Sequence, residues 1–207
     1  LLSKNIKMVV IACNPSGSGS METLTTLFAL PILSVIGPGA RAAVDATRSG
    51  RIGVIGTLGT IRSRAYPNSI REIEPDIRVI DEACSLFVPI VEEGWSDTEV
   101  ARLTAERYLD PLKEQEVDTV VLGCTHYPLL EKTISEVMGP GVKLINPAVN
   151  TAREVREVLK NGDMLRKAGS EPTINFYVSD FGQSFQNIGS RFLNREIAAE
   201  CIDIETY

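Results

Sequence analysis

Short apolar runs alternate with helical stretches along most of the 207-residue chain, and this alternation restricts its fold more than any other feature. Alternating strands and helices predict an α/β fold with parallel strands. Several runs lack a polar residue at every second position, which is typical of parallel strands buried on both faces. We expect strands at Met8–Ala12, Ile32–Val35, Ile52–Ile55, Ile77–Ala83, Thr119–Leu122, Lys143–Ile145 and Thr173–Val178.

The segments between these runs have helical patterns. Ser96 and Asp97 supply a cap for the helix that follows them. We expect helices near Met21–Phe28, Ala40–Thr47, Thr60–Ile73, Asp97–Glu114, Tyr127–Val137, Thr151–Lys160 and Gln183–Phe192.

The composition fits a globular protein and argues against two kinds of partner. Hydrophobic residues make up 43% of the chain and charged residues 23%, which is ordinary for a folded domain. The net charge of −6 and the lack of a Lys/Arg cluster argue against nucleic-acid binding. No apolar run approaches the roughly 18 residues of a membrane span, and the first residues do not resemble a signal peptide. We therefore expect a cytoplasmic protein without a nucleic-acid or membrane partner.

Four cysteines, Cys13, Cys84, Cys124 and Cys201, lie far apart and without CxxC spacing. His126 is the single histidine, so the residues that zinc prefers are too few for a site. We expect no metal, and in a reducing compartment we expect free thiols.

A short internal repeat places two of these cysteines in the same setting. Met8–Asn14 aligns with Thr119–Thr125, since each has four largely apolar or β-branched residues, a small residue, a cysteine and a polar residue. Arg51–Thr57 is a weaker third copy without a thiol. Ligands of open α/β sheets bind outside the carboxyl ends of the strands. A lone cysteine there is more often a packing residue, but the repeat favours two thiols that face one cleft. Without such a setting, the other two cysteines are expected to be core or surface thiols.

A specific motif surrounds the second cysteine of the repeat. Gly123–Leu130 resembles the signature of the aspartate/glutamate racemase superfamily, and Ala12-Cys13-Asn14 resembles the first half of its other signature. The similarity extends from the first residues to about Arg191. Further segments resemble the glutamate racemase branch, namely Pro38–Ala43, Gly53–Thr57, Gly59–Ser63 and Phe87–Trp95.

The resemblance implies an architecture and an activity. It implies two similar α/β lobes with parallel sheets and an active site in the cleft between them. We expect residues 1–35 with 148–207 to form the first lobe and residues 36–147 the second. The implied activity is cofactor-independent interconversion of L- and D-glutamate, which supplies D-glutamate for peptidoglycan synthesis. The implied partner is this small-molecule substrate, and a homodimer is compatible with the same observations.

Two thiols suit this reaction. Inversion of an α-carbon requires removal of a proton from one face and return of a proton to the other. A single base would tend to return the proton to the face that lost it, whereas a thiolate and a thiol on opposite faces can perform both steps. Cysteine suits both roles because its reference pKa of about 8.5 lies near working pH. We therefore expect Cys13 and Cys124 to be catalytic.

Neighbouring polar residues are expected to assist the thiols. His126 resembles the family histidine that tunes the adjacent thiol, because an imidazolium favours a thiolate; a partly exposed turn histidine is the alternative. Glu92 resembles a family acid that assists the catalytic groups, and a solvated acid near a helix start is nearly as consistent. Thr57 and Thr60 are expected to line the substrate pocket, and a role in capping the turn explains their presence equally well. The expected substrate-binding residues are Asn14, Pro15, Thr57, Thr60, Thr125 and His126.

Three features depart from the family pattern. The family's opening strand and the aspartate that partners the first thiol have no counterpart, which favours the presence of residues upstream of Leu1. Pro15 stands where the family usually has threonine, and it offers neither an N–H nor a hydroxyl. Gly37 replaces an acid. The glycine-rich and serine-rich stretch from Pro15 to Ser20 favours an altered or disordered loop over a helix start.

Other functions stay open at this point. An aspartate racemase is the nearest, although the segments that end at Ser63 and Trp95 favour glutamate. A catalytically impaired fragment that only binds a ligand or contacts a partner is the second. A thiol hydrolase is the third, and the single histidine and the superfluous second thiol weaken it.

We expect residues 1–207 by themselves to show little or no racemase activity, because the family aspartate is absent and Pro15 removes a donor. A lost hydrogen bond to a charged group costs roughly 1.5–3 kcal/mol, or about one to two decades in binding. Addition of the family's opening segment and Pro15→Thr should raise the activity, and the segment should matter more. Circular dichroism of D-glutamate at saturating concentration measures it, and robust turnover by the unmodified chain would contradict this expectation.

Overall fold

The computed structural model describes residues 2–166, 169, 171–180 and 182–206. The chain divides into two compact units, Leu1–Leu165 and Arg166–Tyr207. Every strand pair among the described residues is parallel, which confirms the expected α/β class with parallel strands. The assignment of residues 1–35 and 148–207 to one lobe stays a prediction.

A four-stranded parallel sheet forms the centre of the first unit. Its strands, in the order β4-β3-β5-β6, are Arg78–Ala83, Arg51–Gly56, Thr119–Gly123 and Lys143–Ile145. A separate parallel pair in the same unit joins β1 (Val9–Ile11) to β2 (Ile32–Ser34).

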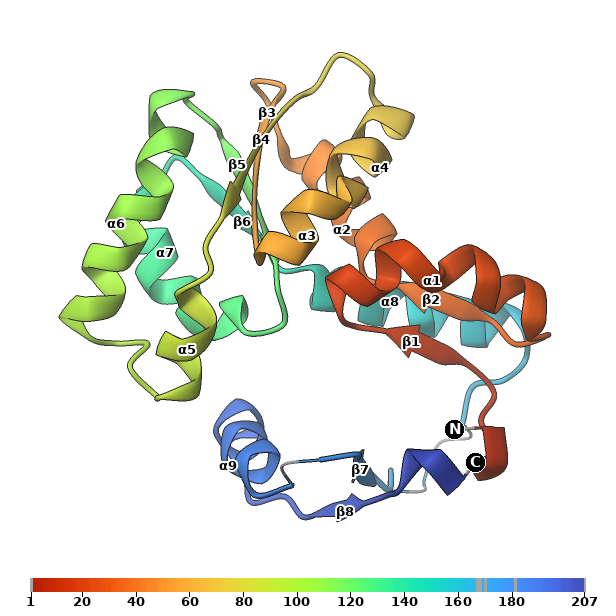
Figure 1. Cartoon of the computed structure of the whole chain (residues 1–207). Coiled ribbons are helices and arrows are strands. Elements are labelled where there is room, and N and C mark those ends of the chain that lie inside the picture. Colours follow the sequence, from red (N-terminus) through yellow and green to blue (C-terminus); the bar gives the residue numbers. More distant parts are fainter. Residues whose placement is uncertain (1, 167–168, 170, 181, 207) are drawn as a thin grey trace. The chain divides into compact units, whose positions relative to one another are not determined.

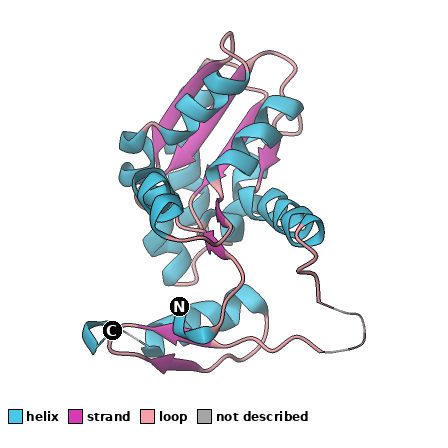
Figure 2. Ribbon diagram, turned by 90° about the vertical axis from the view of Figure 1, so that its right-hand side faces the viewer, coloured by secondary structure: helices cyan, strands magenta, loops and turns pink. Residues whose placement is uncertain are grey.

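Helices cover both faces of the four-stranded sheet (Figures 1 and 2). Val120 and Leu122 of β5 point to one face and Val121 points to the other, and all three are buried. Because successive strand side chains alternate between faces, a strand covered on both must be apolar throughout. The helices on the Val120 face are α5 (Phe87–Glu92), α6 (Glu99–Glu114) and α7 (Glu131–Met138), and those on the Val121 face are α2 (Ile36–Ala46) and α4 (Ala65–Ile73).

The remaining elements flank these layers or belong to the second unit. In the first unit they are η1 (Leu2–Lys4), α1 (Asn14–Leu27), α3 (Leu58–Ser63), η2 (Tyr127–Leu130) and α8 (Pro147–Asn161). In the second unit β7 (Phe176–Val178) pairs with β8 (Ala199–Cys201), accompanied by α9 (Gly182–Leu193) and η3 (Ile204–Thr206).

The stretch from Pro15 to Ser20 is helical, so the expected loop is wrong. α1 begins at Asn14, directly after Cys13, and Pro15 lies in its first turn. Proline is favoured at the first helical positions because the N–H that it lacks would have no partner within the helix. Position in the helix therefore outweighs the poor helix propensity of the glycines that follow.

Two other expected helices begin or break elsewhere. The helix expected at Thr60–Ile73 is two helices, because Arg64 adopts a left-handed conformation with φ 56° between α3 and α4. α6 begins after Thr98, whose hydroxyl accepts a hydrogen bond from the Ala101 N–H, and not at the expected Ser96 and Asp97 cap. The short elements α5 and β8 were not predicted, since neither is long enough to show a clear period.

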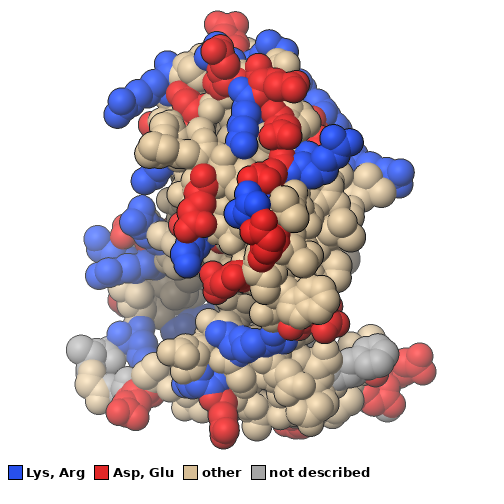
Figure 3. Space-filling model, turned by 90° about the vertical axis from the view of Figure 1, so that its left-hand side faces the viewer, with Lys and Arg blue, Asp and Glu red and all other residues tan. Residues whose placement is uncertain are grey.

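Charges on the surface of the first unit are mixed. On α6, Arg102 pairs with both Glu99 and Glu106, and acidic and basic side chains are interspersed over the face drawn in Figure 3. Across the described residues, no helix combines the length and the apolar character that a membrane crossing requires.

Asp118 ties the start of β5 to the turn that precedes β3. Its carboxylate accepts hydrogen bonds from Thr47 Oγ1 at 2.6 Å and from the backbone N–H groups of Arg48 and Ser49, each at 2.7 Å. Burial alone would raise the pKa of this carboxyl, but the hydrogen bonds outweigh burial and hold the pKa well below its ordinary value. The fold therefore favours the charged form.

We expect Asp118→Ala to lower the free energy of unfolding at pH 7 by about 2–3 kcal/mol, because charge-assisted hydrogen bonds are lost. Asp110→Ala, which removes only an exposed pair with Lys113, should change it little. A carboxyl whose pKa is lower in the folded state stabilises the fold above the unfolded pKa of about 3.9 and loses this contribution as the pH falls through the folded pKa. The difference between wild type and Asp118→Ala in urea unfolding should thus shrink below about pH 4. A constant difference from neutral to acidic pH would contradict this.

Candidate active site

Cys13 and Cys124 each follow a parallel strand at its carboxyl end. Cys13 is exposed and forms the N-cap of α1, just after β1. Cys124 is partly buried and directly follows β5. Burial raises the pKa of the Cys124 thiol and negative charge on Cys13 raises it further, while hydrogen bonds from His126 and Thr125 oppose the shift without reversing it. Cys13 therefore lies close enough to Cys124 for its charge to affect the Cys124 thiol.

A line of polar groups leads away from Cys124. His126 Nδ1 lies 3.8 Å from Cys124 Sγ, and His126 Nε2 lies 3.1 Å from Glu92 Oε1. When Nε2–H donates to the Glu92 carboxylate, Nδ1 is the unprotonated nitrogen and can accept the thiol proton. The structure thus brings three of the four predicted catalytic residues into one hydrogen-bonded series, and it places the fourth, Cys13, in electrostatic range.

Aromatic packing holds the two elements that carry this series. Glu92 is the last residue of α5, and His126 directly precedes η2. The Phe87 ring at the start of α5 packs edge to face on Tyr127 of η2, with ring centroids 5.3 Å apart. The Tyr127 hydroxyl also donates a hydrogen bond to the Cys84 carbonyl at 2.9 Å. Because these rings are buried, they pack α5 against η2 and place Glu92 beside His126.

The predicted substrate-binding residues differ in exposure. Thr125 is exposed, and its hydroxyl lies 3.4 Å from His126 Nδ1. Asn14 is buried, with 4% exposed, and its Oδ1 accepts a hydrogen bond from the Tyr66 hydroxyl at 2.8 Å. Pro15 is exposed, and its ring lies next to Gly59, where a Cβ would approach Pro15 Cγ to 3.4 Å. The substrate role of these residues stays a prediction.

The two threonines after β3 make internal hydrogen bonds. Thr57 is the N-cap of α3 and accepts from the Thr60 N–H at 3.4 Å. The buried Thr60 hydroxyl donates to the Gly123 carbonyl at 3.1 Å, next to Cys124. These contacts account for both residues as supports of the turn that follows β5, and pocket lining stays a prediction.

Sequence reasoning missed Tyr66, which contacts Asn14. A buried tyrosine usually has a partner for its hydroxyl, but nothing in the sequence shows which residue that is. The contact joins positions 52 residues apart, so only tertiary structure reveals it.

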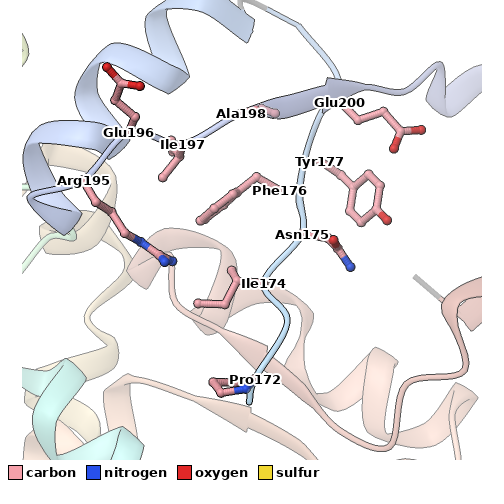
Figure 4. A pocket seen from close by; sticks show the side chains of 11 residues that line it. Pro172, Ile174, Asn175, Phe176, Tyr177, Arg195, Glu196, Ile197, Ala198 and Glu200 are labelled. Atoms are coloured by element: carbon pink, nitrogen blue, oxygen red, sulfur yellow. The ribbon is translucent and has the colours of Figure 1, made fainter. Parts of the chain in front are cut away.

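The second unit contains a cavity of about 540 Å³ (Figure 4). Its lining comes from the segments around β7 and β8, including Phe176, Tyr177 and Arg195. None of the predicted site residues lines it. Across the described part of the chain, no group of three or more His, Cys, Asp and Glu side chains could hold a metal ion.

The chain combines a parallel α/β fold with two cysteines that follow strands at their carboxyl ends, and comparison with known proteins identifies its family. The model of the Asp/Glu/Hydantoin racemase family matches residues 1–155. A glutamate racemase from Geobacter metallireducens is 49% identical over 197 residues, which are 95% of this chain and 73% of that relative. The chain therefore belongs to the Asp/Glu/Hydantoin racemase family, and it is a racemase by class.

Solved structures of relatives agree with this assignment. The crystal structure of a glutamate racemase isoform from Bacillus anthracis has a TM-score of 0.90 at 36% identity. The match covers 96% of this chain and 74% of the Bacillus anthracis chain. A glutamate racemase from Francisella tularensis, in complex with D-glutamate, has a TM-score of 0.90 at 29% identity. The match covers 100% of this chain and 77% of the Francisella tularensis chain. This chain is thus similar to glutamate racemases in both sequence and fold.

We expect alkylation of Cys124 by iodoacetamide to require a higher pH than alkylation of a free thiol. Only the thiolate reacts, and a raised pKa lowers the thiolate fraction at any given pH, so the rate should still be rising above about pH 8.5. Mass spectrometry of the peptide that contains Cys124 measures the rate, with N-acetylcysteine as the reference. A midpoint at or below that of the reference would show that His126 and Thr125 outweigh burial.

Proposed function

We propose that Cys13 and Cys124 of this chain interconvert L- and D-glutamate without a cofactor, by proton transfer to and from the substrate α-carbon, and that turnover by residues 1–207 by themselves is slow. One observation carries the proposal: both thiols stand at the carboxyl ends of parallel strands, and Cys124 begins the series of polar groups that continues through His126 to Glu92. The similarity to glutamate racemases, one of them in complex with D-glutamate, supports glutamate as the substrate.

Each turnover moves two protons and leaves no net change in charge. A thiolate on one face takes the α-proton, and the electron pair of the broken C–H bond delocalises into the substrate carboxylate. The thiol on the opposite face then donates its proton to the α-carbon. The raised pKa of Cys124 favours its thiol form in the resting protein, so Cys124 donates a proton in the direction that begins from this form. The reverse direction uses the same pair with the roles exchanged.

His126 and Glu92 allow Cys124 to act both as an acid and as a base. Cys124 can accept a proton only as the thiolate, and an imidazolium beside it stabilises that form. Glu92 in turn stabilises the imidazolium and fixes the ring orientation. Both residues thereby oppose the effect of burial at the moment when Cys124 has to be charged.

Hydrogen-bond donors near the thiols would hold the substrate carboxylates. Asn14 and Thr125 each directly follow a thiol in the sequence. The first backbone N–H groups of α1, a 14-residue helix capped by Cys13, lack partners within the helix and favour a nearby anion. We also propose that the protein acts in the cytoplasm. There its product, D-glutamate, would be used for peptidoglycan synthesis.

We expect Cys13→Ser and Cys124→Ser each to slow racemisation by about 10²–10⁴-fold, the usual contribution of a general acid or base. A serine hydroxyl is a far weaker acid than a thiol, so either substitution breaks one proton path. The measurement follows exchange of the glutamate α-proton with D₂O by NMR and appearance of the other enantiomer by circular dichroism, at a protein concentration that detects slow turnover.

Cys201→Ser is the matched control, because Cys201 is an exposed thiol in the second unit and should not affect the rate. Aspartate is assayed in parallel, and faster exchange of aspartate than of glutamate would reassign the substrate. Wild-type racemisation by either the Cys13 or the Cys124 variant would refute the two-thiol mechanism. A wild-type chain that binds glutamate but exchanges no α-proton would point to a binding module.

A further inference from the structure

Tyr66 lies between the two turns that carry the thiols. It is the second residue of α4, and its side chain is only 1% exposed. Its hydroxyl reaches Asn14, the residue after Cys13, at 2.8 Å. Tyr66 belongs to the four-stranded sheet and its helices, whereas Asn14 begins the helix that follows β1. One buried hydrogen bond therefore joins α4, which packs on the four-stranded sheet, to the start of α1, which follows β1 of the strand pair.

The ring of Tyr66 contacts the other thiol turn. A Cβ on Gly123, the residue before Cys124, would lie 3.4 Å from Tyr66 Cε2. A Cβ on Gly39 of α2 would lie 3.1 Å from Tyr66 Cε1, tighter than most real contacts. The ring is thus wedged between two glycines that leave room for it. Tyr66 consequently spans from the residue before one thiol to the residue after the other.

The hydrogen bond also determines which side of the Asn14 amide is available. Burial raises the pKa of Tyr66 well above its ordinary value, so the phenol keeps its proton and can donate it. An asparagine side chain has one acceptor oxygen and one nitrogen with two donor protons. Once Oδ1 accepts from Tyr66, the nitrogen remains as the donor. A carboxylate accepts hydrogen bonds and is repelled by an amide oxygen, so this orientation suits an anionic substrate.

We propose that Tyr66 is a positioning residue that holds the Asn14 amide with its N–H₂ toward the substrate carboxylate, while its ring sets the distance between the two thiol turns. This inference rests on the proposed glutamate racemase function, because it needs a carboxylate substrate between Cys13 and Cys124. Tyr66 itself does not touch the reacting atoms. It acts through Asn14 and through the turn at Gly123.

The test uses Tyr66→Phe in the full chain, since phenylalanine keeps the ring between Gly39 and Gly123 and removes only the hydroxyl. The KM for α-proton exchange of D- and L-glutamate in D₂O should rise about tenfold, within the one to two decades of a lost charge-assisted hydrogen bond. The kcat should change less than about threefold, because the thiols keep their places. The matched control is Tyr108→Phe, which also removes one phenol hydrogen bond, to the Leu86 N–H, and should leave KM unchanged.

A double variant shows whether Tyr66 acts through Asn14. In an Asn14→Ala background, Tyr66→Phe should raise KM no further, whereas independent effects would multiply. Asn14→Asp is the second test, because it keeps an acceptor for the Tyr66 hydroxyl and removes the donor. Its KM should rise at least as much as that of Tyr66→Phe, with a wild-type far-ultraviolet circular dichroism spectrum, so the test stands even if Tyr66→Phe folds poorly.

The outcomes separate this inference from the proposed function. Wild-type exchange of glutamate together with an unchanged KM in Tyr66→Phe or in Asn14→Asp overturns the positioning role alone. Multiplicative effects in the double variant overturn it as well. A wild-type chain that exchanges no glutamate α-proton either by itself or with the family's opening segment added overturns the proposed function and this inference with it.

Discussion

The parallel pairing of β3 with β5 is the constraint on which the rest of the site depends. Its register sets Gly56 opposite Gly123, so both strands end at the same edge of the sheet. A Cβ on Gly123 would lie 2.6 Å from the Ile55 carbonyl oxygen, and one on Gly56 would lie 2.9 Å from Thr60 Cβ. Neither space admits a side chain. The two glycines therefore allow a close approach that brings Thr60 against the Gly123 carbonyl and presents Cys124 at the end of the sheet.

At this edge of the sheet, neighbouring groups shift the pKa of Cys124 in opposite directions. Burial raises the pKa of Cys124, hydrogen bonds from His126 and Thr125 oppose that rise, and His126 Nε2 in turn lies 3.1 Å from Glu92 Oε1. The rings of Phe87 and Tyr127 hold the helix of Glu92 against the turn of His126. In the proposed reaction a proton carrier has to reach both its thiol and its thiolate form, and these opposing contributions act on that balance.

Local sequence patterns predicted the buried strands well, because burial requires apolar residues there. They predicted the starts and breaks of helices less well, because backbone geometry decides these. The strand expected at Lys143–Ile145 agrees with β6 at both ends, and the apolar run at Thr119 gave β5 to within one residue. The loop expected after Pro15 is a helix, because proline fits a first turn whatever follows it. The break at Arg64 has no local signal, because arginine rarely adopts a positive φ and does so here between two packed helices.

The sequence by itself determined the α/β class, the two strand-end thiols and the family to which they belong, because apolar periodicity and a short motif are both local properties of the chain. It also named Glu92 and His126 as helpers, through resemblance. Only the tertiary structure decided that Glu92 and His126 share a hydrogen bond and that Tyr66 connects Asn14 to the turn of Cys124. Those contacts join segments 34 and 52 residues apart. Their partners are set by how the helices pack on the sheets, and no single segment of sequence contains that information.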